Sequence, residues 1–196
     1  MMKSIDKNNL LLETSRITLR PLEETDITDE YILGLNDPEV NRYLLLRQPQ
    51  TLSLVQEYVR RNWESPISIL FGIFIKDDPS PLVGTIRISE IDFYHYLANV
   101  GVCLFAKRAW KKGYAIEAMR EVVSFAFGDI GLHYLEAGAW SENSNSFELF
   151  RRAGFSETHR IKDKYRFRNE FKEAVYLGAV NRDFKESLVK NDEYYG

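Results

Sequence analysis

Three apolar, β-branched segments follow one another between residues 67 and 106, and they restrict the possible folds more than any other feature of the chain. They are ISILFGIFIKDD (67–78), LVGTIRISEID (82–92) and LANVGVCLFA (97–106), with a proline-containing turn at 78–81. Short apolar runs bounded by turn residues are typical of β-strands. Because the connections between them are short, the three strands are expected to form an antiparallel meander.

A long amphipathic helix is expected directly after the meander, at residues 113–132. Ile116, Met119, Val123 and Phe127 recur at steps of three and four, which places them on one helical face. A similar reading predicts further strands at 16–22, 132–140 and 173–180 and further helices at 24–37, 51–65 and 143–155. The pattern as a whole predicts an α+β (mixed α/β) fold with one mostly antiparallel sheet of about six or seven strands and about four flanking helices.

The composition argues against several classes of protein. The formal net charge is -3, whereas nucleic-acid binders carry a strongly positive field. No segment approaches the roughly 20 apolar residues that cross a bilayer, and the N-terminus lacks the apolar run of a signal peptide. The single cysteine, Cys103, excludes an intramolecular disulfide and fits a reducing compartment. We therefore expect a cytoplasmic protein that binds neither nucleic acid nor a membrane.

The stretch WKKGYAIEAM (110–119) leads from the third strand of the meander into the long helix. A helix start offers backbone N–H groups without an intrahelical partner, and Gly113 lets the backbone approach a ligand closely. Lys107, Arg108, Lys111 and Lys112 add positive charge that favours an anion such as a pyrophosphate. The alternative is a solvated basic helix start without a ligand. The nucleotide-binding patterns GxxxxGK[ST] and GxGxxG are absent.

Residues 97–155 resemble the GNAT superfamily of acetyl-CoA-dependent N-acetyltransferases, and within it the branch of ribosomal-protein N-terminal alanine acetyltransferases. That branch commonly shows W-x-K-G-Y-A-x-E-A, which here is WKKGYAIEA at 110–118. It also shows N-x-x-S followed by a helix and G-F, which here are Asn143 to Ser146 and Gly154-Phe155. RITLRPLEETD (16–26) resembles the first strand of the same family. The resemblance therefore predicts one GNAT-like domain at 15–184, with an N-terminal extension at 1–14 and a charged C-terminal tail at 185–196.

The resemblance also implies where acetyl-CoA, the expected cosubstrate, binds. Backbone N–H groups of the 110–115 loop would hold the pyrophosphate, and the pantetheine arm would run beside the strand that ends near Leu104 and Phe105. The superfamily usually has Gln or Arg where this chain has Trp110, so the anion contact should depend more on the backbone and on Lys111 or Lys112. The residues expected to contact the cofactor are Leu104, Phe105, Trp110, Lys111, Lys112, Gly113, Tyr114, Ala115, Asn143 and Ser146.

Direct transfer within a ternary complex is the family's usual route, so no covalent nucleophile is needed, and Cys103 is expected to be a buried structural thiol. Many members place a tyrosine acid where this chain has Phe150. Ser146 is the nearest replacement, although it could equally be a hydroxyl at the helix start, as Asn143 could be a helix cap.

Glu90, at a strand end, is the first choice for the base that takes the amine proton. Asp92, Glu136 and His95 are weaker choices, and a water relay without a single base is equally compatible. The three histidines show no metal-ligand spacing, so no metal is expected.

The acceptor side should be walled by residues 41–59 and 156–172, by family resemblance. The second segment is rich in Arg, Lys, Tyr and Phe, which suits an acidic or phosphorylated acceptor but also a solvated hairpin. Family members that act on ribosomal proteins often carry an acidic residue and then a tryptophan near the last strand. The nearest residues here are Glu173 and Phe184, which weakens the case for a peptide acceptor.

The expected function is therefore acetylation of a small-molecule primary amine, such as an amino sugar or a nucleotide-linked amino sugar. Acetylation of a protein N-terminus is the alternative in the same class, and a non-catalytic CoA-binding sensor or scaffold is the alternative of another class. Homodimers are common, so a homodimer is expected, although no residue points to it.

Overall fold

The structure is a computed structural model that describes residues 5–46, 48–167 and 169–185. The predicted charged tail therefore lies outside the described residues except for Lys185, as do the first four residues of the predicted extension. The strands are β1 (Leu12–Glu13), β2 (Ile17–Pro21), β3 (Ile69–Ile75), β4 (Leu82–Asp92), β5 (Leu97–Leu104), β6 (Tyr134–Trp140), β7 (Ser156–Phe167) and β8 (Glu170–Val180). The helices are α1 (Asp29–Asn36), α2 (Pro38–Asn41), α3 (Leu52–Glu64), α4 (Tyr114–Gly128) and α5 (Ser144–Arg152), with short 3-10 turns η1 (Glu24–Asp26) and η2 (Lys107–Ala109).

All eight described strands belong to one sheet in the order β1-β2-β3-β4-β5-β6-β8-β7. The predicted meander is confirmed, because β3, β4 and β5 pair antiparallel with one another. The α+β class and the mostly antiparallel sheet are also confirmed, and the described chain has eight strands and five α-helices rather than about six or seven strands and about four helices.

The two additional strands gave no clear signal in the sequence. β1 has only two residues, which is too short for a pattern, yet it places part of the predicted 1–14 extension in the sheet. β7 is exposed along nearly its whole length, so it lacks the alternation of apolar and polar residues. β7 is stabilised by its pairing with β8, and the two strands form a hairpin. This hairpin contains the 156–172 segment, for which the sequence suggested a connection or a solvated hairpin.

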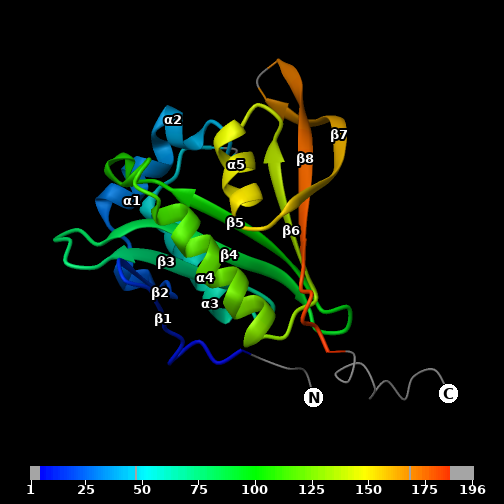
Figure 1. Cartoon of the computed structure of the whole chain (residues 1–196). Helices are drawn as coiled ribbons and strands as arrows, with labels where there is room; N and C mark the ends of the chain where they lie inside the picture. Colours follow the sequence, from blue (N-terminus) through cyan, green and yellow to red (C-terminus); the bar gives the residue numbers. More distant parts are fainter. Residues whose placement is uncertain (1–4, 47, 168, 186–196) are drawn as a thin grey trace.

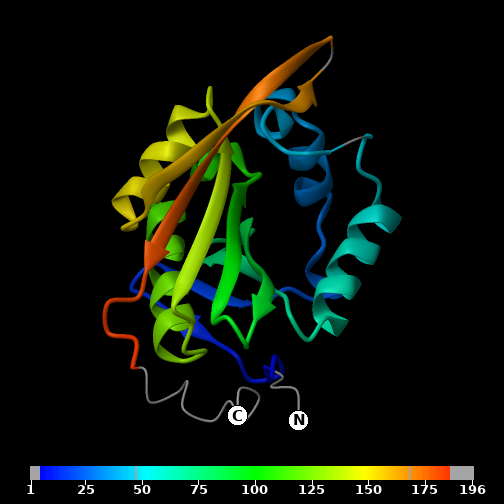
Figure 2. The same cartoon turned by 90° about the vertical axis from the view of Figure 1, so that its right-hand side faces the viewer.

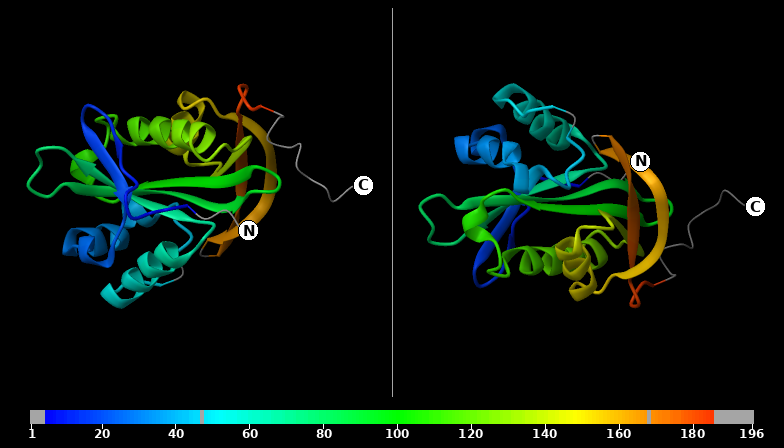
Figure 3. Two further views of the ribbon diagram at one scale, coloured as in Figure 1. Left: turned by 90° about the horizontal axis from the view of Figure 1, so that it is seen from below. Right: turned by 90° about the horizontal axis from the view of Figure 1, so that it is seen from above.

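The sheet separates two layers of helices. α4 and α5 cover one face, while α1, α2 and α3 lie on the other, as the views in Figures 1 and 2 show. The β7–β8 hairpin curves around the end of the sheet towards the side of α1 and α2 (Figure 3). The ring of Tyr43, which follows α2, lies edge-on to Trp140 of β6 at 6.1 Å between centroids. Tyr165 and Phe167 of β7 also contact Trp140, so the hairpin and the segment after α2 both pack against this residue.

Polar side chains fix several helix ends. The hydroxyl groups of Thr28 and Thr51 accept hydrogen bonds from the backbone at the starts of α1 and α3. At the other end of α3, the ammonium of Lys7 donates to the backbone carbonyls of Asn62, Trp63 and Ser65 at 2.6 to 2.8 Å. Within the residues that the structure describes, no helix is both long and apolar enough to cross a membrane.

β5 and β6 form the one parallel pair of the described sheet, and the pair is short. Leu97 to Asn99 lie opposite Tyr134 to Glu136, and the pairing ends there. Beyond this point β5 stays with β4 as far as Leu104, while β6 continues along β8 to Trp140. The two strands therefore separate after Asn99 and Glu136, and this splay is visible in Figure 1.

The close contact of Gly84 in β4 with β5 gives a test of this arrangement. A Cβ at Gly84 would lie 2.5 Å from the Cys103 carbonyl oxygen and 2.6 Å from Leu104 Cδ2. We expect Gly84→Ala to lower the free energy of unfolding by about 1–3 kcal/mol, because the backbone of β5 would have to move. Urea denaturation measures the change.

The matched control is Gly101→Ala in β5, where an added Cβ meets no atom within 4 Å. This variant should leave the free energy of unfolding nearly unchanged. An equal effect of the two substitutions would show that the close approach at Gly84 is not the cause.

Candidate functional site

The loop before α4 contains two residues with left-handed backbone conformation directly before the helix. Lys111 and Gly113 both adopt the left-handed conformation, with φ of 61° and 86°. The first backbone bond at the start of α4 runs from the N–H of Glu117 to the Gly113 carbonyl, at 3.1 Å. The N–H groups of Tyr114, Ala115 and Ile116 therefore lack an intrahelical acceptor. Left-handed turns of this kind create concave anion-binding sites.

A residue from the other end of the domain holds this loop in place. Arg16, directly before β2, donates to the Lys112 carbonyl at 2.9 Å and to the Glu117 carboxylate at 2.7 Å. Its guanidinium also lies 4.9 Å from the centre of the Tyr114 ring. Thr14 donates a second hydrogen bond to Glu117. Arg16 thereby holds the Lys112 carbonyl on the protein side of the loop.

The sequence analysis missed Arg16 and Glu117 as functional residues. Both lie inside the segments that resemble the family, but nothing in either segment alone indicates that they pair. Partial burial would raise the pKa of Glu117, but the hydrogen bonds from Thr14 and Arg16 outweigh it and hold the pKa below its usual value. Glu117 is therefore an ionised partner for Arg16 at neutral pH.

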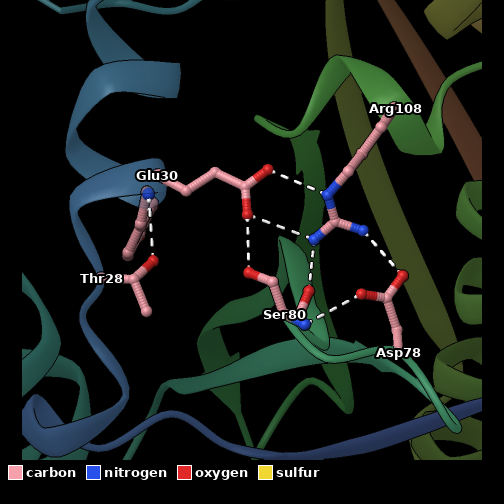
Figure 4. A network of polar contacts seen from close by, with 6 residues as sticks. Thr28, Glu30, Asp78, Ser80 and Arg108 are labelled. Atoms are coloured by element: carbon pink, nitrogen blue, oxygen red, sulfur yellow. Dashed lines mark hydrogen bonds and ion pairs between the residues drawn. The ribbon is translucent and has the colours of Figure 1, made fainter.

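Two of the four cations expected around the loop are instead committed to acidic side chains. Lys107 pairs with Asp37 at 2.7 Å and with Glu39. Figure 4 shows Arg108 between Glu30 and Asp78, at 3.0 and 2.8 Å, with a further bond to the Ser80 carbonyl. These pairs tie the η2 turn to α1, α2 and the β3–β4 turn. The positive charge left for a ligand is that of Lys111 and Lys112, which are exposed.

Leu104, the last residue of β5, and Phe105, which follows it, differ in their surroundings. The indole N–H of Trp110 donates to the Leu104 carbonyl at 2.9 Å and so fixes the loop against the end of β5. Phe105 is only 2% exposed, and its ring stacks on Tyr31 at 4.4 Å between centroids. Its side chain therefore belongs to the core, which leaves its main chain alone for any contact with a ligand.

A cavity of about 530 Å³ lies at the splay of β5 and β6. Its walls come from β5 and β6 on one side and from the β7–β8 hairpin on the other, and the lining residues are Asn99, Val100, Glu136, Gly138, His159, Ile161, Lys164, Tyr165 and Tyr176. Glu136 and Gly138 alternate with the buried Leu135 and Ala137, so they lie on the opposite face of β6. The cavity therefore lies on the face of β6 opposite to Leu135 and Ala137. Figure 2 shows α4 and α5 together on one face of the sheet.

The three carboxylates among the four candidate bases have different surroundings. Glu90 lies in a bulge of β4 with φ of 55°, and its carboxylate accepts a hydrogen bond from the Asn99 side chain, which lines the cavity. Glu136 lines the cavity itself and is the register partner of Asn99. Asp92 caps the following turn by accepting from the N–H groups of Tyr94 and His95, at 2.8 and 2.9 Å. Glu90 and Glu136 are therefore the carboxylates that flank Asn99 at the splay.

The start of α5 combines a capping residue with an available hydroxyl. Asn143 accepts from the Ser146 N–H at 3.1 Å, so it caps the helix. The Ser146 hydroxyl is half-buried and makes no hydrogen bond within the described part of the chain. Phe150 is 2% exposed and lies edge-on to Phe155, so its position belongs to the core.

Cys103 is unsuited to nucleophilic chemistry. It lies in β5 opposite Thr85, and burial raises the pKa of its thiol to about 12. Because the thiolate is the reactive form, only a fraction on the order of 10⁻⁴ of the thiol would be reactive at pH 8. Among the described residues, no group of three or more His, Cys, Asp or Glu side chains is placed to hold a metal ion.

Comparisons with known proteins agree with this geometry. Residues 16–156 match the family model described as the acetyltransferase (GNAT) domain. The chain is 28% identical over 183 residues to the "Probable N-acetyltransferase YjcK" of Bacillus subtilis, which covers 88% of this chain and 98% of that protein. It is 24% identical over 178 residues to the "Uncharacterized N-acetyltransferase p20" of Bacillus licheniformis, covering 88% of this chain and 97% of that protein.

One similar solved structure is the spermidine N-acetyltransferase from Vibrio cholerae in complex with CoA and spermine. Its TM-score is 0.76 at 17% identity, with 87% of this chain and 99% of that chain covered. At this level of identity the similarity shows a shared fold.

Replacing Arg16 should weaken coenzyme A binding without unfolding the protein. We expect Arg16→Leu to raise the dissociation constant for coenzyme A about tenfold, because the lost charge-assisted hydrogen bonds no longer position the loop. Isothermal titration calorimetry measures the constant. Glu117→Gln should have a smaller effect in the same direction, and the control Arg61→Leu, an exposed residue of α3, should have none. Unchanged binding in Arg16→Leu would contradict a positioning role.

Proposed function

The chain belongs to the GNAT acetyltransferase family, and from this premise we propose that it transfers an acetyl group directly from acetyl-CoA to a primary amine on a small polar molecule. The proposed acceptor is an amino sugar or a nucleotide-linked amino sugar. That the chain is an acetyl-CoA-dependent N-acetyltransferase follows from the family and its similarity to N-acetyltransferases. The proposal concerns the acceptor and the roles of individual residues.

The observation that carries the proposal is the position of the splay between two sites. The anion-binding loop begins α4, which lies with α5 on one face of the sheet, and the cavity lies on the face of β6 opposite to Leu135 and Ala137. The pairing of β5 and β6 ends at Asn99 and Glu136, so no ladder hydrogen bonds join the two strands beyond these residues. We propose that a cosubstrate held by its pyrophosphate at the loop presents its thioester at this splay to an amine in the cavity.

The fit of coenzyme A is supported by the loop's own geometry. Left-handed backbone at Lys111 and Gly113, together with the N–H groups that begin α4, suits a pyrophosphate. The exposed Lys111 and Lys112 add the charge that a dianion needs. The main chain of Leu104 and Phe105 lies at the start of the loop, where the pantetheine arm would pass.

In the proposed reaction the amine nitrogen attacks the thioester carbonyl carbon, and the carbon–sulfur bond breaks. Glu90, oriented by Asn99, takes the proton that the amine loses. The Ser146 hydroxyl donates a hydrogen bond to the departing thiolate, which takes its proton from solvent, since Phe150 has no hydroxyl to offer. No covalent enzyme intermediate is involved, in keeping with the raised pKa of Cys103.

The lining of the cavity favours a sugar-like acceptor over a polycation. His159 stacks on Tyr176 with ring centroids 4.5 Å apart, and Tyr165 adds a further aromatic side chain. Flat aromatic and polar groups suit a small polar ring. A polyamine such as the spermine bound by the Vibrio cholerae protein needs several acidic partners, but Glu136 is the single carboxylate among the lining residues, and Lys164 would repel it.

The function is tested by measuring thiol release from acetyl-CoA with a panel of amines. We expect turnover with amino sugars or nucleotide-linked amino sugars to exceed turnover with spermidine and with N-terminal alanine peptides. A preference for the peptides would favour the protein N-terminal alternative. Uptake of coenzyme A without turnover of any amine would favour the non-catalytic alternative.

Gly113→Glu should abolish coenzyme A binding in calorimetry and turnover with it. The new side chain is strained at a φ of 86° and adds a negative charge where the pyrophosphate would lie. The matched control is Gly128→Glu at the far end of α4, where a Cβ meets no atom within 4 Å. Wild-type binding by the Gly113→Glu variant would refute the proposed role of the loop.

Glu90→Gln should lower kcat about 100-fold while KM for acetyl-CoA stays near its wild-type value, because only proton removal is lost. Steady-state kinetics with the preferred amine measures both constants. The control Glu57→Gln removes an exposed carboxylate of α3 and should change neither. An unaffected kcat in Glu90→Gln would leave a water relay or Glu136 as the alternative.

A further inference from the structure

We propose that the cavity at the splay selects acceptors that carry a negatively charged group in addition to the amine, and that Lys164 recognises that group. This inference depends on the proposed acetyl transfer for its kinetic consequences. The chemical class is an amine with a phosphoryl or carboxylate group a short distance away, and the two sources of negative charge are separated in the experiment below.

The cavity contains two opposite charges that do not neutralise each other. Glu136 comes from β6 and Lys164 from β7, and both line the same space. Within the described residues, neither side chain takes part in an ion pair. Opposite charges kept apart in one cavity leave each of them available to a ligand that carries the complementary charges.

Other cations of the same hairpin behave differently. Arg160 pairs with Glu157 and Glu173 at 2.6 and 3.1 Å. Lys172 pairs with Glu142 and Glu170 at 2.7 and 2.8 Å. Carboxylates therefore neutralise these cations, whereas Lys164, the lysine that lines the cavity, has neutral partners.

Tyrosine side chains hold the Lys164 ammonium without cancelling its charge. The ammonium donates a hydrogen bond to the Tyr176 hydroxyl and lies 4.4 Å from the centre of the Tyr176 ring and 5.3 Å from that of Tyr165. The hydrogen bond with Tyr176 raises the pKa of Lys164, so the side chain stays protonated at neutral pH. His159 stacks on the Tyr176 ring, and this stacking limits the movement of the ring.

The positions of the two charges assign an end of the cavity to each ligand group. Glu136 lies beside Asn99 at the splay, where the thioester would arrive, so the amine belongs at this end. Lys164 lies on the hairpin, so the anionic group belongs there. A neutral amino sugar, a polyamine and an unmodified peptide N-terminus would each leave Lys164 without a partner.

Pairs of acceptors that differ by one negative charge test the inference. Comparing glucosamine 1-phosphate with glucosamine tests the effect of the phosphoryl group. Comparing alanine with alaninamide tests the effect of the carboxylate. We expect the wild-type protein to show a kcat/KM at least about tenfold higher for the charged member of one pair. The pair with the larger ratio identifies the kind of anion, and this ratio should fall as ionic strength rises.

Four variants separate the two ends of the cavity. Lys164→Gln should lower kcat/KM about tenfold for the charged acceptor and leave the neutral acceptor unchanged, and Lys164→Arg should retain part of the preference. Lys162→Gln makes the same charge change two residues away, outside the cavity lining, and should alter neither value. Glu136→Gln should weaken both members of a pair alike, because both carry the amine.

The inference is overturned if Lys164→Gln affects charged and neutral acceptors equally, or if the wild-type protein shows no preference within either pair.

Calorimetric titration of glucosamine 1-phosphate and alanine into the CoA-loaded protein tests the same point without turnover. If no amine is acetylated but Lys164→Gln still weakens binding of a charged compound, the proposed function fails and the anion site remains. If amines are acetylated and the Lys164 variant changes nothing, only the anion site fails.

Discussion

The short parallel pairing of β5 and β6 is the constraint on which the site depends. Each strand is committed to a different neighbour, β5 to β4 over seven register pairs and β6 to β8 over another seven. Only three parallel pairs join these two long antiparallel units, so the units diverge beyond the third pair. The separation after Asn99 and Glu136 opens the sheet where the chemistry is proposed. A longer parallel pairing would close the gap and bury the same residues.

The loop that follows β5 is held in place by contacts with the rest of the domain. Trp110 attaches it to the Leu104 carbonyl, and Arg16 attaches it to the segment before β2. Neither contact uses the N–H groups at the start of α4, which have no acceptor within the helix. Gly113 adopts the left-handed conformation without steric strain, and these contacts offset the strain at the non-glycine Lys111.

Local patterns predicted the elements with an apolar period, and they failed where tertiary contacts decide. The β3–β4–β5 meander was predictable from its nearly continuous apolar runs, and α4 from the helical spacing of its apolar residues. β7 was not, since its stability comes from pairing with β8 on an exposed edge. From the sequence, Lys107 and Arg108 were expected to offer their charge to a ligand. In the structure they form ion pairs with acidic residues that are distant in sequence, namely Asp37, Glu39, Glu30 and Asp78. The pair of Arg16 and Glu117 spans the chain, so no local pattern could reveal it.

The apolar character of the Phe150 position shapes the proposed mechanism as much as the polar residues do. With that side chain in the core, the departing thiolate has no phenol beside it, and the thiol of Cys103 is held in its protonated form by burial. The start of α5 offers a different means of stabilisation. Asn143 occupies the N–H of Ser146, which leaves earlier N–H groups and the positive end of the helix dipole near the free Ser146 hydroxyl. A thiolate stabilised by this dipole can depart as the anion, so a hydrogen bond from a serine or from water suffices and no strong acid is needed. On this argument the demanding proton transfer is removal of the amine proton, which is why the carboxylates beside Asn99 matter more than the missing tyrosine.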